Sequence, residues 1–249
     1  MNLAIDIGNS TIRVATALEQ QIGEVWQISS KTKDVAGELV QILARLKKPV
    51  QKSIIASVKP ELNNTVYHVV RSFCRSEPVF ASLKQGFSLD YSCYEGLLGI
   101  DRALCCEAAN QLTAPPFVVV DLGTATTINL VDENRRFRGG LIFPGVQMGL
   151  AALANNTALL PPVQPEPAVP LIGQNTRECL LAGAVHGTAL FLDKAIAKIW
   201  SQLGREGATV ITGGSAPVIT PHLETRSILE PNLLVKGLFT VLNRYGEGS

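Results

Sequence analysis

The sequence predicts an α/β protein made of two duplicated lobes, each with a mixed β-sheet flanked by helices. Two observations support this prediction. Apolar strand-like runs alternate with helical patterns along the 249 residues. In addition, an acidic glycine turn between two strand-like runs occurs twice, at 6–11 and at 121–127. Because one such turn opens each half of the chain, we expect lobes over residues 1–114 and 115–249.

The first half begins with strand-like runs and continues as alternating helices and strands. Strands are predicted over 2–7, 11–18, 24–29, 53–58 and 78–81, and helices over 34–46, 61–75 and 99–112. Pro60 ends the fourth strand, and Pro115–Pro116 end the last helix, because proline lacks the backbone amide that both structures need. Residues 84–98 have no periodic pattern and are predicted to be irregular.

The second half repeats this plan. Strands are predicted over 117–121, 125–132, 136–143 and 208–212, and helices over 145–156, 176–203 and 231–244. The proline-rich residues 160–170 form an extended connector. The helix over 176–203 is apolar, but its five charged side chains favour a buried helix of a soluble protein over a membrane span. Gly183 and Gly187, one turn apart, leave room for a packing partner within the lobe or for a second subunit.

The composition is that of a globular protein in the cytoplasm. Hydrophobic residues make up 46% of the chain, and the formal net charge of +1 gives no electrostatic reason to expect nucleic acid or a membrane as partner. Five cysteines without a Cys-x-x-Cys pair, and three histidines, predict neither a zinc site nor a disulfide framework. The chain starts directly with a strand, without signal-peptide features, so we expect a cytoplasmic location.

The two acidic glycine turns have the chemistry of phosphate binding. Asp6-Ile7-Gly8-Asn9-Ser10-Thr11 and Asp121-Leu122-Gly123-Thr124-Ala125-Thr126-Thr127 each place a glycine where the backbone can approach a ligand. Turn amides and hydroxyls suit phosphate oxygens, and the leading aspartate can hold a metal ion or its water. One such turn alone is often only a hairpin connection. Two such turns, one in each half of the chain, predict the two sides of a site that binds the phosphates of a nucleotide.

Two further motifs each allow two interpretations. In Gly99-Ile100-Asp101-Arg102, Asp101 either accepts a proton from an attacking hydroxyl or simply complements the dipole of the helix that begins there. Arg102 is correspondingly a carboxylate-binding residue or a surface charge. The run 210–216, a strand followed by Gly213-Gly214, is either a flat platform for an adenine ring or a plain connector.

Taken together, these motifs resemble the type III pantothenate kinases of the acetate/sugar kinase and actin-like superfamily. The resemblance covers nearly the whole chain, and the order and spacing of its motifs are specific. The segments that carry it are 6–10, 57–60, 99–102, 121–126, 140–145, 175–176, 183–187 and 212–214. It implies two actin-like, ribonuclease H-like lobes. It also implies ATP-dependent phosphorylation of the primary hydroxyl of pantothenate to 4'-phosphopantothenate, the first step of coenzyme A synthesis.

The resemblance also implies roles for individual residues. Asp101 is the catalytic base, Asp121 binds a monovalent cation (K⁺ or NH₄⁺), and Asp6 is a candidate ligand for Mg²⁺. The residues that hold the ATP phosphates are Asp6, Ile7, Gly8, Asn9, Ser10, Thr11, Ile12, Arg13 and Thr124. Those that line the pantothenate site are Tyr91, Gly99, Ile100, Asp101, Arg102 and Thr176. The family members are similar in forming homodimers, and we expect a homodimer here.

The chain departs from the family pattern in two places. Thr11 stands where the family often has asparagine, and the segment before Gly99 lacks the usual proline. The second departure leaves open whether Tyr91 or Tyr94 faces the substrate, and we favour Tyr91. Two alternative functions remain: a non-catalytic transcription accessory factor, and a superfamily kinase for another small hydroxy acid or sugar. The retained acids disfavour the first, and Arg102, suited to a carboxylate, disfavours a neutral sugar.

Overall fold

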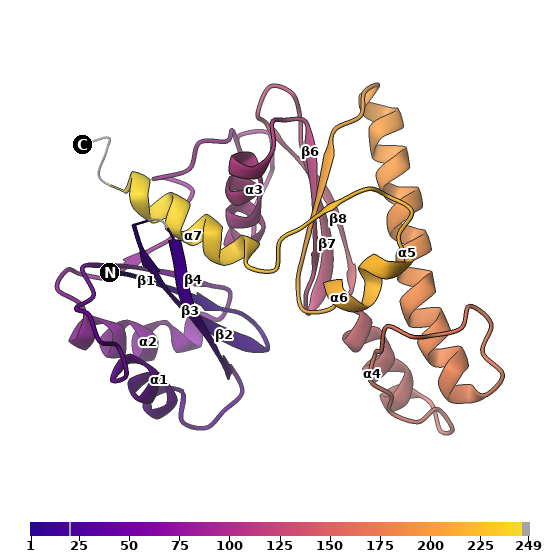
Figure 1. The fold of residues 1–249 in the computed structure, drawn as a ribbon, viewed down its shortest axis with the longest axis horizontal. Helices are drawn as coiled ribbons and strands as arrows, with labels where there is room; N and C mark the ends of the chain where they lie inside the picture. Colours follow the sequence, from indigo (N-terminus) through magenta and orange to yellow (C-terminus); the bar gives the residue numbers. More distant parts are fainter. Residues whose placement is uncertain (20, 246–249) are drawn as a thin grey trace. The chain divides into compact units, whose positions relative to one another are not determined.

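The computed structural model describes residues 1–19 and 21–245, which form two compact units (Figure 1). Of the described residues, unit 1 contains those of Met1–Tyr91, Glu95–Leu112 and Asn232–Tyr245, and unit 2 contains Ser92–Tyr94 and Thr113–Pro231. The sequence predicted a division at residues 114 and 115, with the whole C-terminal part in the second lobe. The structure differs because the last helix returns to unit 1.

Unit 1 contains a five-stranded mixed sheet in the order β3-β2-β1-β4-β5. Strands β1 (Asn2–Ile7), β2 (Thr11–Leu18) and β3 (Gln21–Ser29) form an antiparallel meander, and β4 (Lys52–Ser57) and β5 (Val79–Phe80) add parallel to β1. Residues 3–7 of β1 are all buried. Consecutive burial of this kind is typical of a central strand that is covered on both faces.

Helices cover both faces of this sheet. On one face, α1 (Val35–Leu43) and α2 (Pro60–Phe73) pack against alternate strand residues such as Leu3 and Ile5. On the other face lie α3 (Ile100–Leu112) and α7 (Leu233–Arg244), which contact each other and the central strands (Figure 1). A Cβ on Gly237 of α7 would lie 2.1 Å from the carbonyl oxygen of Leu104. This backbone-to-backbone approach explains why the C-terminal helix belongs to unit 1.

Unit 2 repeats the sheet of unit 1. Its order is β10-β9-β6-β7-β8, with β6 (Phe117–Leu122), β7 (Ala125–Val131) and β8 (Phe137–Pro144) antiparallel. Strands β9 (Ala208–Thr212) and β10 (Ile228–Leu229) continue parallel to β6. Each unit thus has a central strand with an antiparallel meander on one side and parallel strands on the other. The predicted duplication is confirmed.

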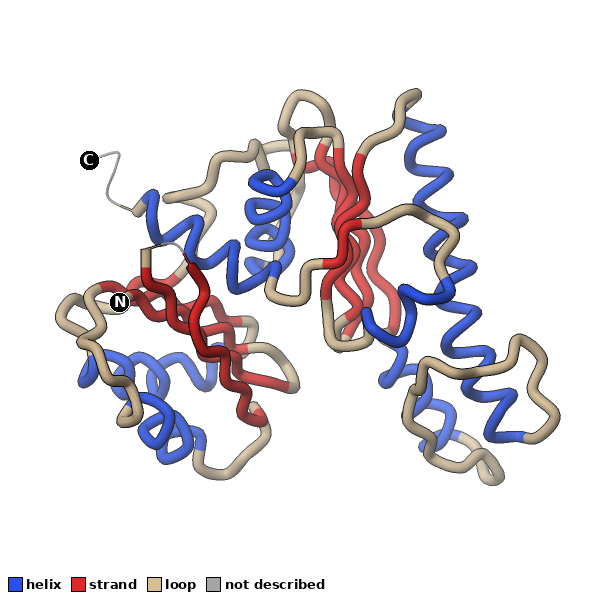
Figure 2. Tube along the Cα trace, viewed as in Figure 1, coloured by secondary structure: helices blue, strands red, loops and turns tan. Residues whose placement is uncertain are grey.

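The helices of unit 2 pack on its sheet around α5 (Thr176–Leu203), the long helix of Figure 2. The others are α4 (Val146–Asn156), α6 (Ala216–Ile219) and the 3₁₀ turn Thr220–His222. By length and composition α5 could cross a membrane. Its residues Leu181, Val185, Leu192 and Ile196 instead lie in the hydrophobic core of the unit. It is a partly buried core helix, as the sequence predicted.

Most predicted elements are present with small shifts at their ends. Strand β3 starts at Gln21 instead of residue 24, and α7 starts at Leu233 instead of residue 231. Helix α2 starts at Pro60, because proline is well suited to the first helical position. The sequence did not predict β10, a strand of two residues. So short a strand contains no periodic signal.

Candidate active site

The first acidic turn joins β1 to β2 in unit 1. Asp6 is the next-to-last residue of β1 and lies opposite Arg13 of β2. The Arg13 guanidinium donates from Nη1 to Asp6 Oδ2 at 3.1 Å, and Asp6 is only 4% exposed. At the tip, the Gly8 amide donates to the carbonyl of Thr11 at 3.0 Å. The turn therefore carries a buried acid paired with a half-exposed arginine.

Neighbouring segments hold this turn in place. The Ser30 hydroxyl donates to the carbonyl of Asn9 at 2.7 Å, and the Ser30 amide donates to the carbonyl of Ser10 at 3.1 Å. The Lys59 ammonium in turn donates to the carbonyl of Ser30 at 3.1 Å. Asn9 and Ser10 remain exposed at the surface of the unit. Sequence reasoning gave no role to Ser30 or Lys59, because neither lies in the turn itself.

The second acidic turn occupies the equivalent place in unit 2. Asp121 is the next-to-last residue of β6 and lies opposite Thr127 of β7, as Asp6 lies opposite Arg13. Thr124 is exposed at the tip, and its carbonyl accepts a hydrogen bond from the Gly145 amide at 3.2 Å. The two turns are thus duplicated structures, each ending the central strand of its sheet.

The diglycine motif lies beside this second turn. Gly213 has a φ of +100°, and a Cβ placed on it would lie 2.5 Å from Asp121 Oδ1. The Ser215 amide donates to the carbonyl of Leu122 at 3.0 Å. Since β9 is parallel to β6, the carboxyl ends of both strands meet at one edge of the sheet. The motif at 212–214 and the turn at 121–124 therefore form one continuous backbone surface.

The Gly99–Arg102 motif forms the start of α3 in unit 1. Asp101 is half-buried in the first turn, and its Oδ1 accepts the Arg102 amide at 2.9 Å. A Cβ on Gly99 would lie 2.5 Å from the same oxygen, so a larger residue there would collide with the carboxylate. Within residues 1–19 and 21–245, Asp101 Oδ2 has no hydrogen-bond partner. Arg102 is buried, at 8% exposed.

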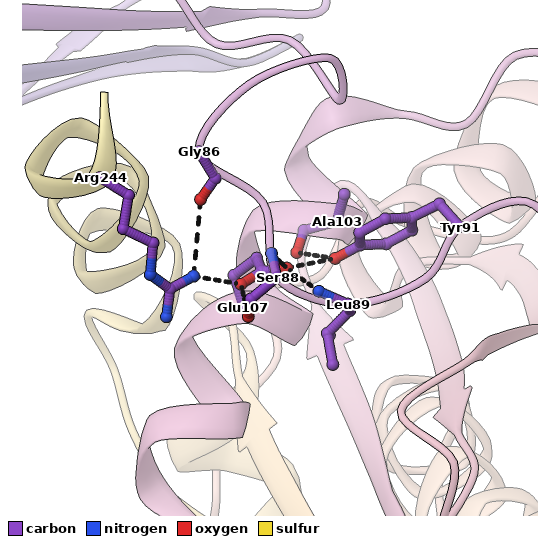
Figure 3. Close-up of polar contacts among 7 residues, drawn as sticks. All are labelled: Gly86, Ser88, Leu89, Tyr91, Ala103, Glu107 and Arg244. Atoms are coloured by element: carbon purple, nitrogen blue, oxygen red, sulfur yellow. Dashed lines mark hydrogen bonds and ion pairs between the residues drawn. The ribbon is translucent and has the colours of Figure 1, made fainter. Parts of the chain in front are cut away.

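The two candidate tyrosines have different surroundings. The Tyr91 hydroxyl lies 3.1 Å from the carbonyl oxygen of Ala103 and 3.3 Å from Glu107 Oε1 (Figure 3). Burial raises the pKa of this hydroxyl far above its usual value, and the neighbouring Cys106 and Glu107 raise it further. Tyr94, in unit 2, packs edge-on against Phe137 with ring centroids 5.4 Å apart. The assignment of Tyr91 to the substrate site stays a prediction.

Thr176 is the first residue of α5 and is exposed. The preceding Asn175 caps the helix, because its Oδ1 accepts the Glu178 amide at 3.0 Å. Thr176 also lines an apolar groove of about 640 Å³ between α4 and α5. Gly183 and Phe191 line the same groove further along α5.

The predicted site residues are divided between the two units. In unit 1 these are the Asp6–Arg13 turn, Tyr91 and the start of α3, and in unit 2 the Asp121 turn, the diglycine motif and Thr176. Among the described residues, no three His, Cys, Asp or Glu side chains gather as a metal site. Single carboxylates such as Asp6 and Asp121 fit an ion whose other ligands are phosphate oxygens and water. The groups have the chemistry to hold phosphates and to accept a proton.

Comparison with known proteins decides the family. A model of the family "Type III pantothenate kinase" matches residues 2–198. The chain belongs to the type III pantothenate kinase family. It is 31% identical to the type III pantothenate kinase of Persephonella marina over 99% of this chain and 100% of the relative. It is 30% identical to that of Brevibacillus brevis, over 98% and 99% respectively.

Solved structures confirm the two-lobed actin-like fold. A protein described as a Baf family transcriptional activator from Campylobacter jejuni matches with a TM-score of 0.62 at 23% identity, over 97% of both chains. A glucokinase from Streptomyces griseus matches with a TM-score of 0.53 at 13% identity, over 99% of both. Structural similarities at such low sequence identity show the fold only. The activity is inferred from membership of the family.

As a type III pantothenate kinase, the chain is an enzyme that phosphorylates pantothenate in coenzyme A biosynthesis and uses ATP. The predictions of family, fold class and activity are confirmed. Sequence reasoning missed one group in this part of the chain, the buried Glu107 and its partner Arg244. A lone glutamate in a helix has no sequence signal that separates a buried role from an exposed one.

Proposed function

We propose that this kinase transfers the γ-phosphoryl group of ATP to the primary hydroxyl of pantothenate, with Asp101 as the base. The observation that carries the proposal is the setting of Asp101 at the start of α3. One of its carboxylate oxygens is held by the Arg102 amide at 2.9 Å. The other oxygen, Oδ2, would accept a hydrogen bond from the substrate hydroxyl. A positioned carboxylate of this kind contributes a factor of about 10²–10⁴ to the rate.

The two acidic turns are proposed to bind the phosphates. Residues 6–13 and Thr124 supply backbone amides, hydroxyls and the Arg13 guanidinium. Phosphoryl transfer has a loose transition state, so its catalysis consists mainly of in-line positioning and of neutralising charge on the phosphoryl oxygens. Arg13, paired with Asp6 at 3.1 Å and half-exposed, is a fixed positive charge suited to that task.

Two cations complete this proposal. Asp6 would hold Mg²⁺ or one of its waters, and Asp121 would hold K⁺ or NH₄⁺. When bound, such ions offset the negative charge of the phosphates. The oxygen-rich edge formed by Asp121 and the backbone around Gly213 has the hard donors that these ions take. Asp121 is partly exposed, so ions from solution can reach it.

Pantothenate is proposed to bind at the start of α3, with Gly99, Ile100 and Tyr91 around it. Arg102 would hold the substrate carboxylate. Arg102 as a whole is only 8% exposed, and a charge-assisted hydrogen bond to an anion is stronger where water is largely excluded. A guanidinium forms charge-assisted hydrogen bonds with a carboxylate and not with a neutral sugar, so the arginine favours a substrate that carries a carboxylate.

We further propose a cytoplasmic homodimer that is formed through α5. The groove of about 640 Å³ between α4 and α5 is apolar, and Leu190 of α5 is 62% exposed. A Cβ added to Gly183 or Gly187 would meet no atom within 4 Å, so the helix surface there is open to a close partner. An apolar surface of this kind marks an interface. In the dimer, Asp101 of one subunit and Thr176 of the other would serve one site.

A second candidate function is that of a non-catalytic regulator, since the Campylobacter jejuni protein of similar fold is described as a transcriptional activator. Retention of Asp6, Asp101 and Asp121 argues against this candidate. A coupled ADP-release assay with pantothenate, glucose or no acceptor tests the proposal. We expect release with pantothenate alone. Release with glucose instead would indicate another superfamily kinase, and no release with any acceptor would favour the regulator.

A further inference from the structure

Glu107 of α3 is a fully buried carboxylate with an unusually complete set of partners, drawn in Figure 3. Its Oε1 accepts the amides of Ser88 and Leu89, both at 2.8 Å. Its Oε2 accepts the Ser88 hydroxyl at 2.8 Å and the Arg244 guanidinium at 2.8 Å. The Tyr91 hydroxyl lies 3.3 Å from Oε1. All these residues belong to unit 1.

Stability alone does not account for this arrangement. Removing the Glu107 carboxylate from water is unfavourable by several kcal/mol, and an apolar side chain that fills the same volume is often as stable. What the charged pair adds is geometry, because each of its hydrogen bonds requires a defined direction. Glu107 therefore specifies where its partners lie.

The segment that Glu107 binds, residues 87–89, needs contacts that fix its position. Residues 87–89 lie outside any helix or strand, so the sheet does not satisfy their amides. Glu107 accepts two consecutive amides of this segment. This anchors an otherwise irregular stretch to α3 just before Tyr91.

Tyr91 extends the anchor to the first turns of α3. Its hydroxyl lies 3.1 Å from the carbonyl oxygen of Ala103, the residue that follows Arg102. Its ring packs edge-on against Phe87, with centroids 5.8 Å apart. The segment is thus attached to α3 at two places, at Glu107 and next to Arg102.

Arg244 attaches α7 to the same cluster. Besides Glu107, its Nη1 contacts the carbonyl of Gly86 at 3.5 Å. About two turns earlier on α7, Gly237 lies against the backbone of Leu104. Segment 86–91, α3 and α7 therefore meet around one ion pair, in which the carboxylate is fully buried and the guanidinium partly exposed.

We propose that Glu107 is a positioning residue of the pantothenate kinase reaction: together with Arg244 it fixes segment 86–91 on α3 and thereby holds Asp101 and Arg102 in their working orientation. The proposal rests on the roles proposed above for these two residues. It assigns Glu107 no contact with the substrate. A displacement of about 1 Å at a reacting group can lower a rate by a factor of about 10², so the loss of a distant anchor has a measurable effect.

The test uses Glu107→Gln and Arg244→Met in the full chain. Glutamine keeps an oxygen for the two amides but presents an amide group to Arg244, and methionine removes the guanidinium. For each variant, kcat and the KM values for pantothenate and ATP are measured below its melting temperature. We expect KM for pantothenate to rise about tenfold, or kcat to fall by that factor, with KM for ATP within about twofold of the wild type. Arg244→Lys should restore part of the loss.

Asp132→Asn is the matched control. Asp132 is also a buried carboxylate, at 1% exposed, and it binds an arginine, Arg138, at 3.0 Å as well as two backbone amides. It belongs to unit 2. Its substitution should lower the melting temperature as Glu107→Gln does, yet leave KM for pantothenate unchanged.

Three outcomes would overturn the positioning role: wild-type kinetics in both variants, equal rises in the two KM values, or the same kinetic change in Asp132→Asn. If Glu107→Gln does not fold, the Arg244→Met and Arg244→Lys pair gives the same decision. Arg102→Met, measured in parallel, tests the proposed function separately. A normal KM in that variant, with a raised KM in Glu107→Gln, would indicate that the cluster positions some group other than Arg102.

Discussion

The carboxylate of Asp121 lies against the backbone of Gly213, where a Cβ would be only 2.5 Å from Oδ1. The same Cβ would also lie 2.5 Å from the backbone nitrogen of Leu122. The acidic turn and the diglycine turn are therefore packed together without room for a side chain. In unit 1, the segment that leads from β4 into α2 takes the equivalent place beside the first acidic turn. The Val58 amide of this segment donates a hydrogen bond to the carbonyl of Ile7.

Gly213→Ala should therefore disturb the second acidic turn. The added methyl would collide with Asp121, and the φ of +100° disfavours any side chain. We expect KM for ATP to rise about tenfold or more, with a lower melting temperature. Gly23→Ala is the control, because its Cβ would meet mainly the Thr16 hydroxyl, which can rotate away. Unchanged ATP kinetics in Gly213→Ala would separate this turn from the nucleotide site.

The monovalent cation is tested by salt exchange. Asp121 lies in a turn whose backbone oxygens and carboxylate could share K⁺ with a phosphate. We expect pantothenate-dependent turnover to fall strongly when Na⁺ replaces K⁺ at constant ionic strength, and to be retained in NH₄⁺. Equal rates in all three salts would remove the cation from the mechanism.

Arg102→Met tests carboxylate recognition. The loss of a charge-assisted contact of roughly 1.5–3 kcal/mol should raise KM for pantothenate by about 10–100-fold. Initial rates at varied pantothenate and saturating ATP measure this. Arg138→Met, which breaks an ion pair with Asp132 in unit 2, is the control for loss of an arginine. An unchanged KM in Arg102→Met would mean that the carboxylate is bound elsewhere.

Subunit mixing tests the shared site. Asp101→Asn and Thr176→Val proteins, each poorly active alone, are combined and allowed to exchange subunits. If a site takes Asp101 from one copy and Thr176 from the other, each mixed dimer has one intact site. Random exchange makes about half of the dimers mixed, so about a quarter of wild-type activity should return. No recovery after verified exchange would place both residues in one subunit.

Much of the fold could be predicted from local patterns. The repeated acidic turn indicated the duplication, and the apolar runs located every strand except the two-residue β10. The place of α7 could not be predicted, because it depends on the contact of Gly237 with Leu104, two residues far apart in the sequence. Hydrophobic periodicity describes one helix or strand at a time. It does not show that a C-terminal helix packs against the N-terminal unit.

The candidate site, like the fold, could be predicted from the sequence only in part. The Asp6–Arg13 pair follows from the register of a hairpin that the sequence predicts. The Glu107 cluster does not, because its partners come from the irregular segment before Tyr91 and from the C-terminal helix. For the same reason, the sequence could not show that the Tyr91 hydroxyl is engaged with Ala103 and Glu107.

The most direct test of the central claim, that Asp101 takes the proton of the pantothenate hydroxyl, is the turnover rate of Asp101→Asn. Asparagine is nearly isosteric and can still accept the Arg102 amide, which Asp101 Oδ1 accepts at 2.9 Å. The fold, measured by circular dichroism, and ATP binding, measured by calorimetry, should therefore be retained. We expect kcat for pantothenate-dependent ADP release to fall by a factor of about 10² or more. Near-normal turnover in this variant would contradict the account and return Asp101 to the role of a helix-start acid.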